Sequence, residues 1–136
     1  MDYEKDPILT KSFIGTARVR IDCLQFDEGR QVDSQSVKRL LRLFEETKCQ
    51  RYNPDHYVPA IVNLPQLKRI LRASKLNRNA LKAPSEDGTW PFLNLEPSYK
   101  LICVHGKHRI RAAELFLDPD DRWWTVRLFL GSLDGV

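Results

Sequence analysis

No stretch of this 136-residue sequence approaches the roughly 20 consecutive apolar residues that a membrane-spanning helix needs. The first seven residues are acidic and polar, so they lack the basic and apolar segments of a secretory signal peptide. Cysteine is also scarce, with only Cys23, Cys49 and Cys103. These three are widely spaced and form no Cys-x-x-Cys pair, which argues against a zinc site and favours reduced structural thiols. The absences predict an intracellular protein with no membrane partner and no metal centre.

Internal repeats and low-complexity tracts are absent as well. The length is enough for one hydrophobic core, and the hydrophobic fraction of 42% is ordinary for a soluble globular domain. We predict a single folded domain over residues 16–136, preceded by a flexible N-terminal arm of residues 1–15.

Acidic residues are missing from one long stretch, Leu64–Ala83, although the net charge of the chain is only +4. A cluster of cations of this kind can lie on the phosphate backbone of a nucleic acid. A helix face that is simply solvated would show the same pattern, so the sequence leaves both readings open. The basic residues of the stretch are Lys68, Arg69, Arg72, Lys75, Arg78 and Lys82.

Strand and helix signals begin after the N-terminal arm. Alternation of small or apolar residues with charged ones predicts a half-exposed strand over Ala17–Ile21. A helix is predicted to start after a cap at Asp33 or Ser34 and to run to about Lys48. Its apolar residues fall at helical spacing, at Val37, Leu40, Leu41 and Phe44.

In the middle and at the end of the chain, predicted strands continue to alternate with predicted helices. Tyr57–Val62 is predicted to be a strand, and Pro59 favours an edge strand or a strand end. Asn63 is expected to cap a second helix, followed by a loop or short insertion over residues 74–98 that packs down through its apolar residues. Trp123–Leu130 is the predicted last strand. There are too few strands for a doubly wound fold, so we predict an α+β domain with a small mixed sheet and packed helices.

The most informative segment is Lys100–Glu114, which reads as a buried strand that turns at Gly106 directly into a helix. That helix is expected to end near Leu117. His108 and Arg109 lie in its first turn, where unpaired amide groups and the helix dipole attract anions. The segment therefore predicts a phosphate site.

Together with its flanks, this motif resembles the ParB/sulfiredoxin superfamily. The strand Val58–Val62 is similar to the family's Pro-hydrophobic-hydrophobic-Val strand, and Arg30 is similar to its loop arginine. The resemblance covers residues 16 to 131, with an unusual insertion at about 64–97. The segment around Gly106 is also similar to a family of uncharacterised fungal proteins that are normally longer than this chain. The residues that match the superfamily signature Gly-x-(His/Arg)-Arg-x-x-Ala are Gly106, His108, Arg109 and Ala112.

The resemblance implies a nucleotide, because the superfamily holds ATP in sulfiredoxins, CTP in ParB and ADP or ATP in free-serine kinases. It implies that Gly106 forms the turn and that the amides of Lys107 to Arg109 cradle phosphates, with Mg²⁺ accompanying the nucleotide. His108 and Arg109 would contact phosphate directly, and Arg30 would approach the same pocket.

One difference from the family's sequence pattern excludes an activity that the resemblance would otherwise imply. Lys107 stands where sulfiredoxins carry their reactive cysteine, so no thiol can attack from that position and sulfinic acid reduction is not expected. ParB proteins also continue into a helix-turn-helix domain, for which this chain has no counterpart. A complete CTP-gated clamp is therefore not expected of this polypeptide alone.

Three functions remain open for the domain. The first is a nucleotide-binding or phosphate-binding module of a nuclear or cytoplasmic DNA-associated system. The second is an NTPase or small-molecule phosphotransferase resembling a free-serine kinase, for which Asp27 and Glu28 are the candidate catalytic carboxylates. The third is a degenerate module that acts only by DNA or protein interaction through its basic stretch. His56 stands in no motif and receives no role.

Overall fold

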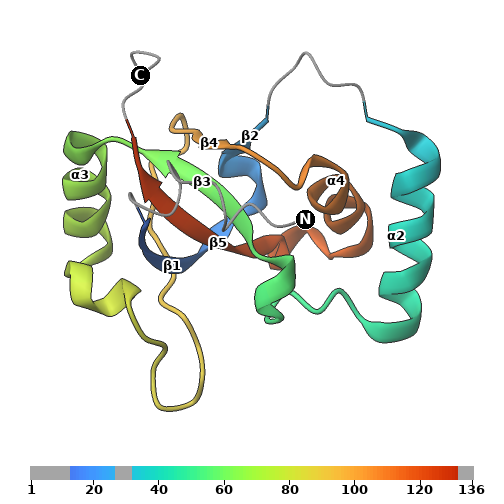
Figure 1. The fold of residues 1–136 in the computed structure, drawn as a ribbon, viewed down its shortest axis with the longest axis horizontal. Helices are drawn as coiled ribbons and strands as arrows, with labels where there is room; N and C mark the ends of the chain where they lie inside the picture. The colour runs from blue at the N-terminus through green and yellow to red at the C-terminus, as the bar shows by residue number, and fades with distance from the viewer. Residues whose placement is uncertain (1–12, 27–31, 132–136) are drawn as a thin grey trace.

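The computed structural model describes residues 13–26 and 32–131 and shows a small α+β domain, as predicted (Figure 1). Five strands form one mixed sheet in the order β1-β5-β3-β4-β2. The pairs β1–β5 and β3–β4 are antiparallel, and β3–β5 and β2–β4 are parallel. The strands are β1 (Phe13–Arg20), β2 (Leu24–Gln25), β3 (Val58–Val62), β4 (Leu101–Cys103) and β5 (Trp123–Leu130).

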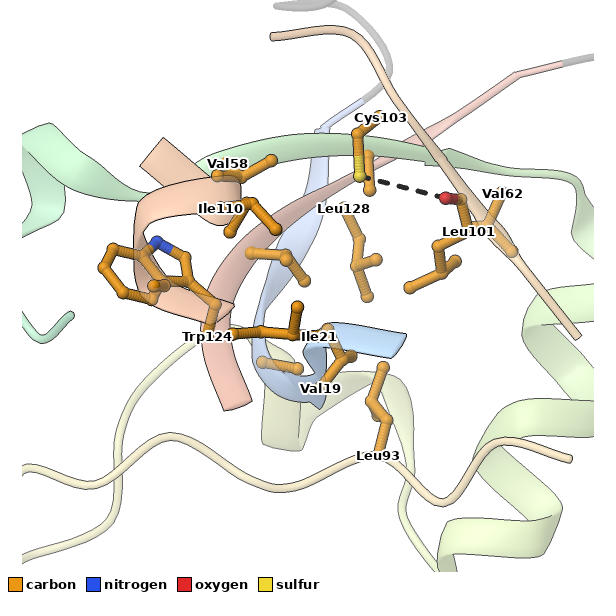
Figure 2. Close-up of a cluster of buried hydrophobic side chains, with 14 of the residues drawn as sticks. Val19, Ile21, Val58, Val62, Leu93, Leu101, Cys103, Ile110, Trp124 and Leu128 are labelled. Atoms are coloured by element: carbon orange, nitrogen blue, oxygen red, sulfur yellow. Dashed lines mark hydrogen bonds between the residues drawn. The ribbon is translucent and has the colours of Figure 1, made fainter. Parts of the chain in front are cut away.

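One face of the sheet carries the main hydrophobic core. Residues of alternating position on β1, β3 and β5 are buried together with residues from all three helices. Figure 2 shows part of this cluster, to which β4, α4 and the segment around Leu93 also contribute. The predicted alternation holds only over Ala17–Arg20, where Ala17 and Val19 are buried and Arg20 is exposed. The strand begins earlier, at Phe13, within the stretch predicted as a flexible arm, and Ile21 lies in a short 3-10 helix. Trp124 is completely buried in this core.

The first long helix, α2 (Ser34–Thr47), begins where its cap predicts. The Asp33 carboxylate accepts a hydrogen bond from the Gln35 amide at 3.1 Å, which satisfies one of the amide groups that a helix start leaves unpaired. Val37 and Phe44 are buried. The helix packs on α4, with the Phe44 and Phe116 rings 5.7 Å apart.

The second helix, α3 (Leu64–Ser74), has a complete capping box at its start. The Asn63 side chain accepts from the Gln66 amide at 2.9 Å, and the Gln66 side chain accepts from the Asn63 amide at 3.3 Å. The apolar face of α3 is buried, and its basic residues point elsewhere. The buried residues of the helix are Leu67, Ile70 and Leu71, as the periodicity predicts.

Pro59 does not mark an edge strand, because β3 is the central strand of the five. It lies near the start of the strand, which agrees with the predicted alternative, a position at a strand end. The ladder between β3 and β4 begins only at Ala60. On the β4 side, the Pro59 carbonyl accepts from the Val104 amide at 3.0 Å, just beyond the end of β4. A missing amide hydrogen at this position therefore interrupts no ladder.

The segment between α3 and β4 packs down, as its apolar residues predict. It contains the short 3-10 helix η4 (Arg78–Leu81), and both Leu81 and Leu93 are buried. The segment also extends the sheet beside β1: the Arg18 amide donates to the Pro91 carbonyl at 2.8 Å, and the Leu93 amide donates to the Arg18 carbonyl at 2.9 Å.

The last helix, α4 (Lys107–Phe116), follows β4 after a sharp turn and ends ahead of Asp118, close to the predicted boundary. The last strand, β5, spans the predicted residues. Within the described residues, no helix is long and apolar enough to cross a membrane. In Figure 1, α4 and α2 lie at one end of the sheet and α3 at the other.

Candidate functional site

The start of α4 depends on a glycine. Gly106 is the N-cap and has φ +101°, a left-handed conformation that side-chain-bearing residues rarely adopt. A Cβ atom at this position would lie 2.8 Å from Cγ2 of Val58, a buried residue of β3. The helix start is thus pressed against the sheet. No side chain from the described residues caps it, so its first amides face outward as potential donors.

A cavity of about 270 Å³ lies at this helix start. It is formed by the segment that leads into β3, the segment that joins β4 to α4, and single residues from the end of β2 and from α2. Its lining residues are Phe26, Leu40, Asp55, His56, Tyr57, Val58, Pro59, Val104, His105, Gly106, Lys107, His108 and Arg109. The structure therefore brings four residues of the predicted phosphate site, Gly106 to Arg109, to one cavity.

Arg109 is the most unusual side chain in this cavity. Its Nη1 atom is buried and makes no hydrogen bond to any residue that the structure describes. Burial lowers the pKa of the guanidinium, and no carboxylate in the described part of the chain forms an ion pair with it. A buried hydrogen-bond donor on a cation is costly to leave unpaired, and an anion would satisfy it. The arrangement favours an anionic ligand that would contact Nη1.

His56 also lines the cavity, although no sequence motif marks it. Burial lowers the pKa of this imidazole, and the nearby positive charge of Arg109 lowers it further. Its Nδ1 atom lies 3.3 Å from the Gln50 carbonyl oxygen, and its own carbonyl accepts from the Trp124 indole at 2.9 Å. The antiparallel pairing of β3 with β4 carries residues 55–58 to the start of α4. His56 lies near Arg109 only because of that long-range pairing, so the local sequence could not have revealed it.

His108 has a different role from the predicted phosphate contact in this structure. Its Nε2 atom accepts a hydrogen bond from the Asp33 amide at 2.9 Å, which joins the start of α2 to the start of α4. Lys107 lines the same cavity beside it. Arg30, Asp27 and Glu28 lie outside the described residues.

Comparison with protein families identifies the family of this chain. Residues 12–135 match the family described as "Protein of unknown function (DUF3723) N-terminal domain". The chain belongs to this family. Neither the curated proteins nor the solved structures contain a match to it.

The basic residues between Leu64 and Ala83 of this DUF3723 N-terminal domain are all exposed, but none of them lines the cavity. Lys68, Arg69 and Arg72 belong to α3, whereas α4 lies at the opposite end of the sheet (Figure 1). Lys75 is the C-cap of α3, and Arg78 begins η4. The cavity at the start of α4 and the basic stretch are therefore two separate candidate sites in the structure.

The domain's cysteines take no part in either site. Cys23, Cys49 and Cys103 are free and buried. Burial raises the pKa of Cys103 to about 12. Among residues 13–26 and 32–131, no cluster of three or more His, Cys, Asp or Glu side chains could hold a metal ion.

Proposed function

We propose that the domain binds the phosphate groups of a nucleotide in the cavity at the start of α4, and that it acts in a nuclear or cytoplasmic DNA-associated system. The observation that carries the proposal is the buried Nη1 atom of Arg109, which has no partner in this cavity. The likeness of the Gly106 motif to the ParB/sulfiredoxin superfamily points to the same ligand class.

The chemistry around Arg109 fits phosphate better than it fits a neutral ligand. The first turn of α4 adds amide donors and the positive end of the helix dipole to the guanidinium. Arg109 can donate two parallel hydrogen bonds to phosphate oxygens. Ligand pockets commonly measure about 300–1,000 Å³, so a cavity of about 270 Å³ suits the phosphate end of a nucleotide rather than the whole molecule.

The nucleotide would be CTP, ATP or ADP, accompanied by Mg²⁺. The residues assigned to its phosphates are Gly106, Lys107 and Arg109, with His108 nearby at the α2 contact. Because no metal cluster is formed by the described side chains, Mg²⁺ would be held mainly by the phosphate oxygens and water, as is usual for this cation.

Thermal unfolding with and without nucleotide tests the proposal. Millimolar CTP, ATP or ADP with Mg²⁺ should raise the melting temperature, because a ligand that binds only the folded state stabilises it. Arg109→Met should abolish that rise. The same variant should unfold at an equal or higher temperature without ligand, because it removes a partly buried charge that no described carboxylate pairs with.

Arg111→Met is the matched control. Arg111 lies two residues further along α4, is exposed, and pairs with Glu114 at 3.3 Å. This variant should keep the full response to nucleotide. The proposal fails if no nucleotide or phosphate compound shifts unfolding of the unmodified protein, or if Arg111→Met and Arg109→Met lose the response equally.

A phosphotransferase is the second candidate, favoured by the position of Asp55 and His56 on the cavity wall. A carboxylate and a neutral imidazole could orient Mg²⁺ or accept a proton from an attacking hydroxyl. Release of phosphate or of ADP in the presence of serine and other hydroxyl compounds distinguishes this activity from passive binding. Loss of turnover in Asp55→Asn, with nucleotide binding kept, would support it.

A further inference from the structure

The exposed side of α3 is rich in cations. Positions 68, 72 and 75 follow one another at spacings of four and three, so their side chains lie along one face, and Arg69 is next to it. The helix's apolar residues occupy the opposite side and are buried. In the part of the chain that the structure describes, none of these cations forms an ion pair. We define the α3 basic face by its residues, Lys68, Arg69, Arg72 and Lys75.

The surroundings in the chain strengthen this charge rather than neutralise it. No acidic residue occurs from Leu64 to Ala83, and Arg78 and Lys82, both exposed, follow the helix directly. Self-repulsion among so many cations destabilises a folded surface slightly. A surface of this kind is ready to accept a polyanion, which would remove the repulsion.

A second helix of the same chain shows what an ordinary basic surface looks like. In α2, Lys38, Arg39 and Arg42 have the same relative spacing as Lys68, Arg69 and Arg72 in α3, and they are also exposed. In α2, however, two exposed acids follow three and four residues after Arg42, within reach of it along the helix. These acids are Glu45 and Glu46.

We propose that the α3 basic face binds the sugar–phosphate backbone of duplex DNA without reading its sequence. This proposal deepens the DNA-associated part of the proposed function, but it shares no residue with the cavity at α4. The two ideas can therefore fail separately.

The composition of the face argues against a membrane surface. Helices that lie on membranes bury a row of large apolar side chains among the lipids. In α3 the corresponding residues, Leu67, Ile70 and Leu71, are already buried in the protein core. Single-stranded nucleic acid is also less suited, because its binding depends on aromatic side chains that stack with bases. No aromatic residue occurs in α3 or in the basic stretch that follows it to Ala83.

The experiment compares two triple variants of the 136-residue chain in binding to a labelled 30-base-pair duplex, by fluorescence anisotropy between 50 and 200 mM NaCl. The test variant is K68E/R69E/R72E on α3, and the control is K38E/R39E/R42E on α2. Both change the net charge by the same amount, at equivalent helix positions, so any general effect of charge is the same in the two proteins. Circular dichroism and thermal unfolding check that both variants fold.

The expected result is at least a tenfold loss of affinity in the α3 variant and a much smaller loss in the α2 variant. The slope of log affinity against log salt should fall by about 0.9 for each DNA phosphate that the α3 variant no longer neutralises. Equal losses in both variants would overturn the proposal, because they would show a response to total charge alone. Binding to phosphatidylserine vesicles in preference to DNA would overturn it as well and would favour a membrane. Neither variant should lose the thermal response to nucleotide, whatever happens to DNA binding.

Discussion

The Asp33 amide donates a hydrogen bond to Nε2 of His108 at 2.9 Å. This bond connects the residue that caps α2 with the first turn of α4, two points 75 residues apart in the chain. It separates the roles of two neighbouring motif residues: His108 holds two helices together, while Arg109 keeps a buried polar atom that has no partner among residues 13–26 and 32–131.

His108→Ala should therefore lower stability without removing ligand binding. Loss of the acceptor leaves the Asp33 amide to water, and we expect a cost of about 0.5–1.5 kcal/mol in the free energy of unfolding, measured in urea. The melting temperature should still rise with nucleotide. If instead His108→Ala keeps full stability and loses the nucleotide response, His108 is a ligand contact and its hydrogen bond with the Asp33 amide does not stabilise the fold.

Gly106→Ala should destabilise the protein more than Gly88→Ala. Both glycines have positive φ, +101° and +82°, so both substitutions strain the backbone by about 1–2 kcal/mol. Only the new methyl group at residue 106 would meet another atom, Cγ2 of Val58 at 2.8 Å, whereas space around residue 88 is open to 4 Å. In urea unfolding, Gly106→Ala should lower the free energy of unfolding by about 1–3 kcal/mol more than Gly88→Ala does. Equal losses in the two variants would mean that Val58 moves aside freely.

The native protein should react very slowly with the thiol reagent DTNB. All three cysteines are buried, burial raises the pKa of Cys103 to about 12, and burial followed by the charge of Asp22 raises the pKa of Cys23. Thiolates are the reactive form, so at pH 8 few are present. Three thiols should react in 6 M urea. Fast reaction of even one thiol in the native protein would contradict the buried positions.

Stability should fall as the pH is lowered below about 6.5, and His56 should contribute to the fall. The pKa of His56 is lowered in the folded protein, so the unfolded chain takes up a proton at a higher pH than the folded one. The contribution of His56 is therefore full above 6.5, the ordinary value, and is lost as the pH falls through the lowered pKa. Urea unfolding of the unmodified protein and of His56→Gln, compared from pH 7.5 to 5.0, measures this.

His56→Gln should show the shallower decline over this range, since it removes the group whose protonation differs between the two states. Other groups titrate in both proteins and cancel in the comparison. Parallel curves for the two proteins would show that His56 is as accessible to protons in the folded state as in the unfolded chain.

Local signals predicted most of the secondary structure. The cap at Asp33 and the box at Asn63 mark helix starts through bonds within three residues, so they can be read from neighbours alone. The position of β3 could not be read in this way, because whether Pro59 lies at an edge depends on where the other strands pair. Its neighbour β4 ends at Cys103, which makes room for a proline in a central strand.

The residues of the candidate site divide in the same way, into those that local signals predict and those that depend on long-range contacts. Gly106 and Arg109 were predicted from a local strand–turn–helix pattern, and they do line a cavity. His56 was missed because it reaches Arg109 only through the antiparallel pairing of β3 and β4. The bond that occupies His108 was equally hidden, since its donor lies in a different helix cap.

The walls of the cavity come from four stretches of chain, around residues 26, 40, 55–59 and 104–109. A molecule seated there would tie these stretches together much as a covalent cross-link does, so none of them could open locally without releasing it. Its binding energy would then protect amides against hydrogen exchange well away from any ligand contact, including those of the buried strand β3 and of α2. The domain would respond to its ligand by becoming more rigid as a whole rather than by moving one loop.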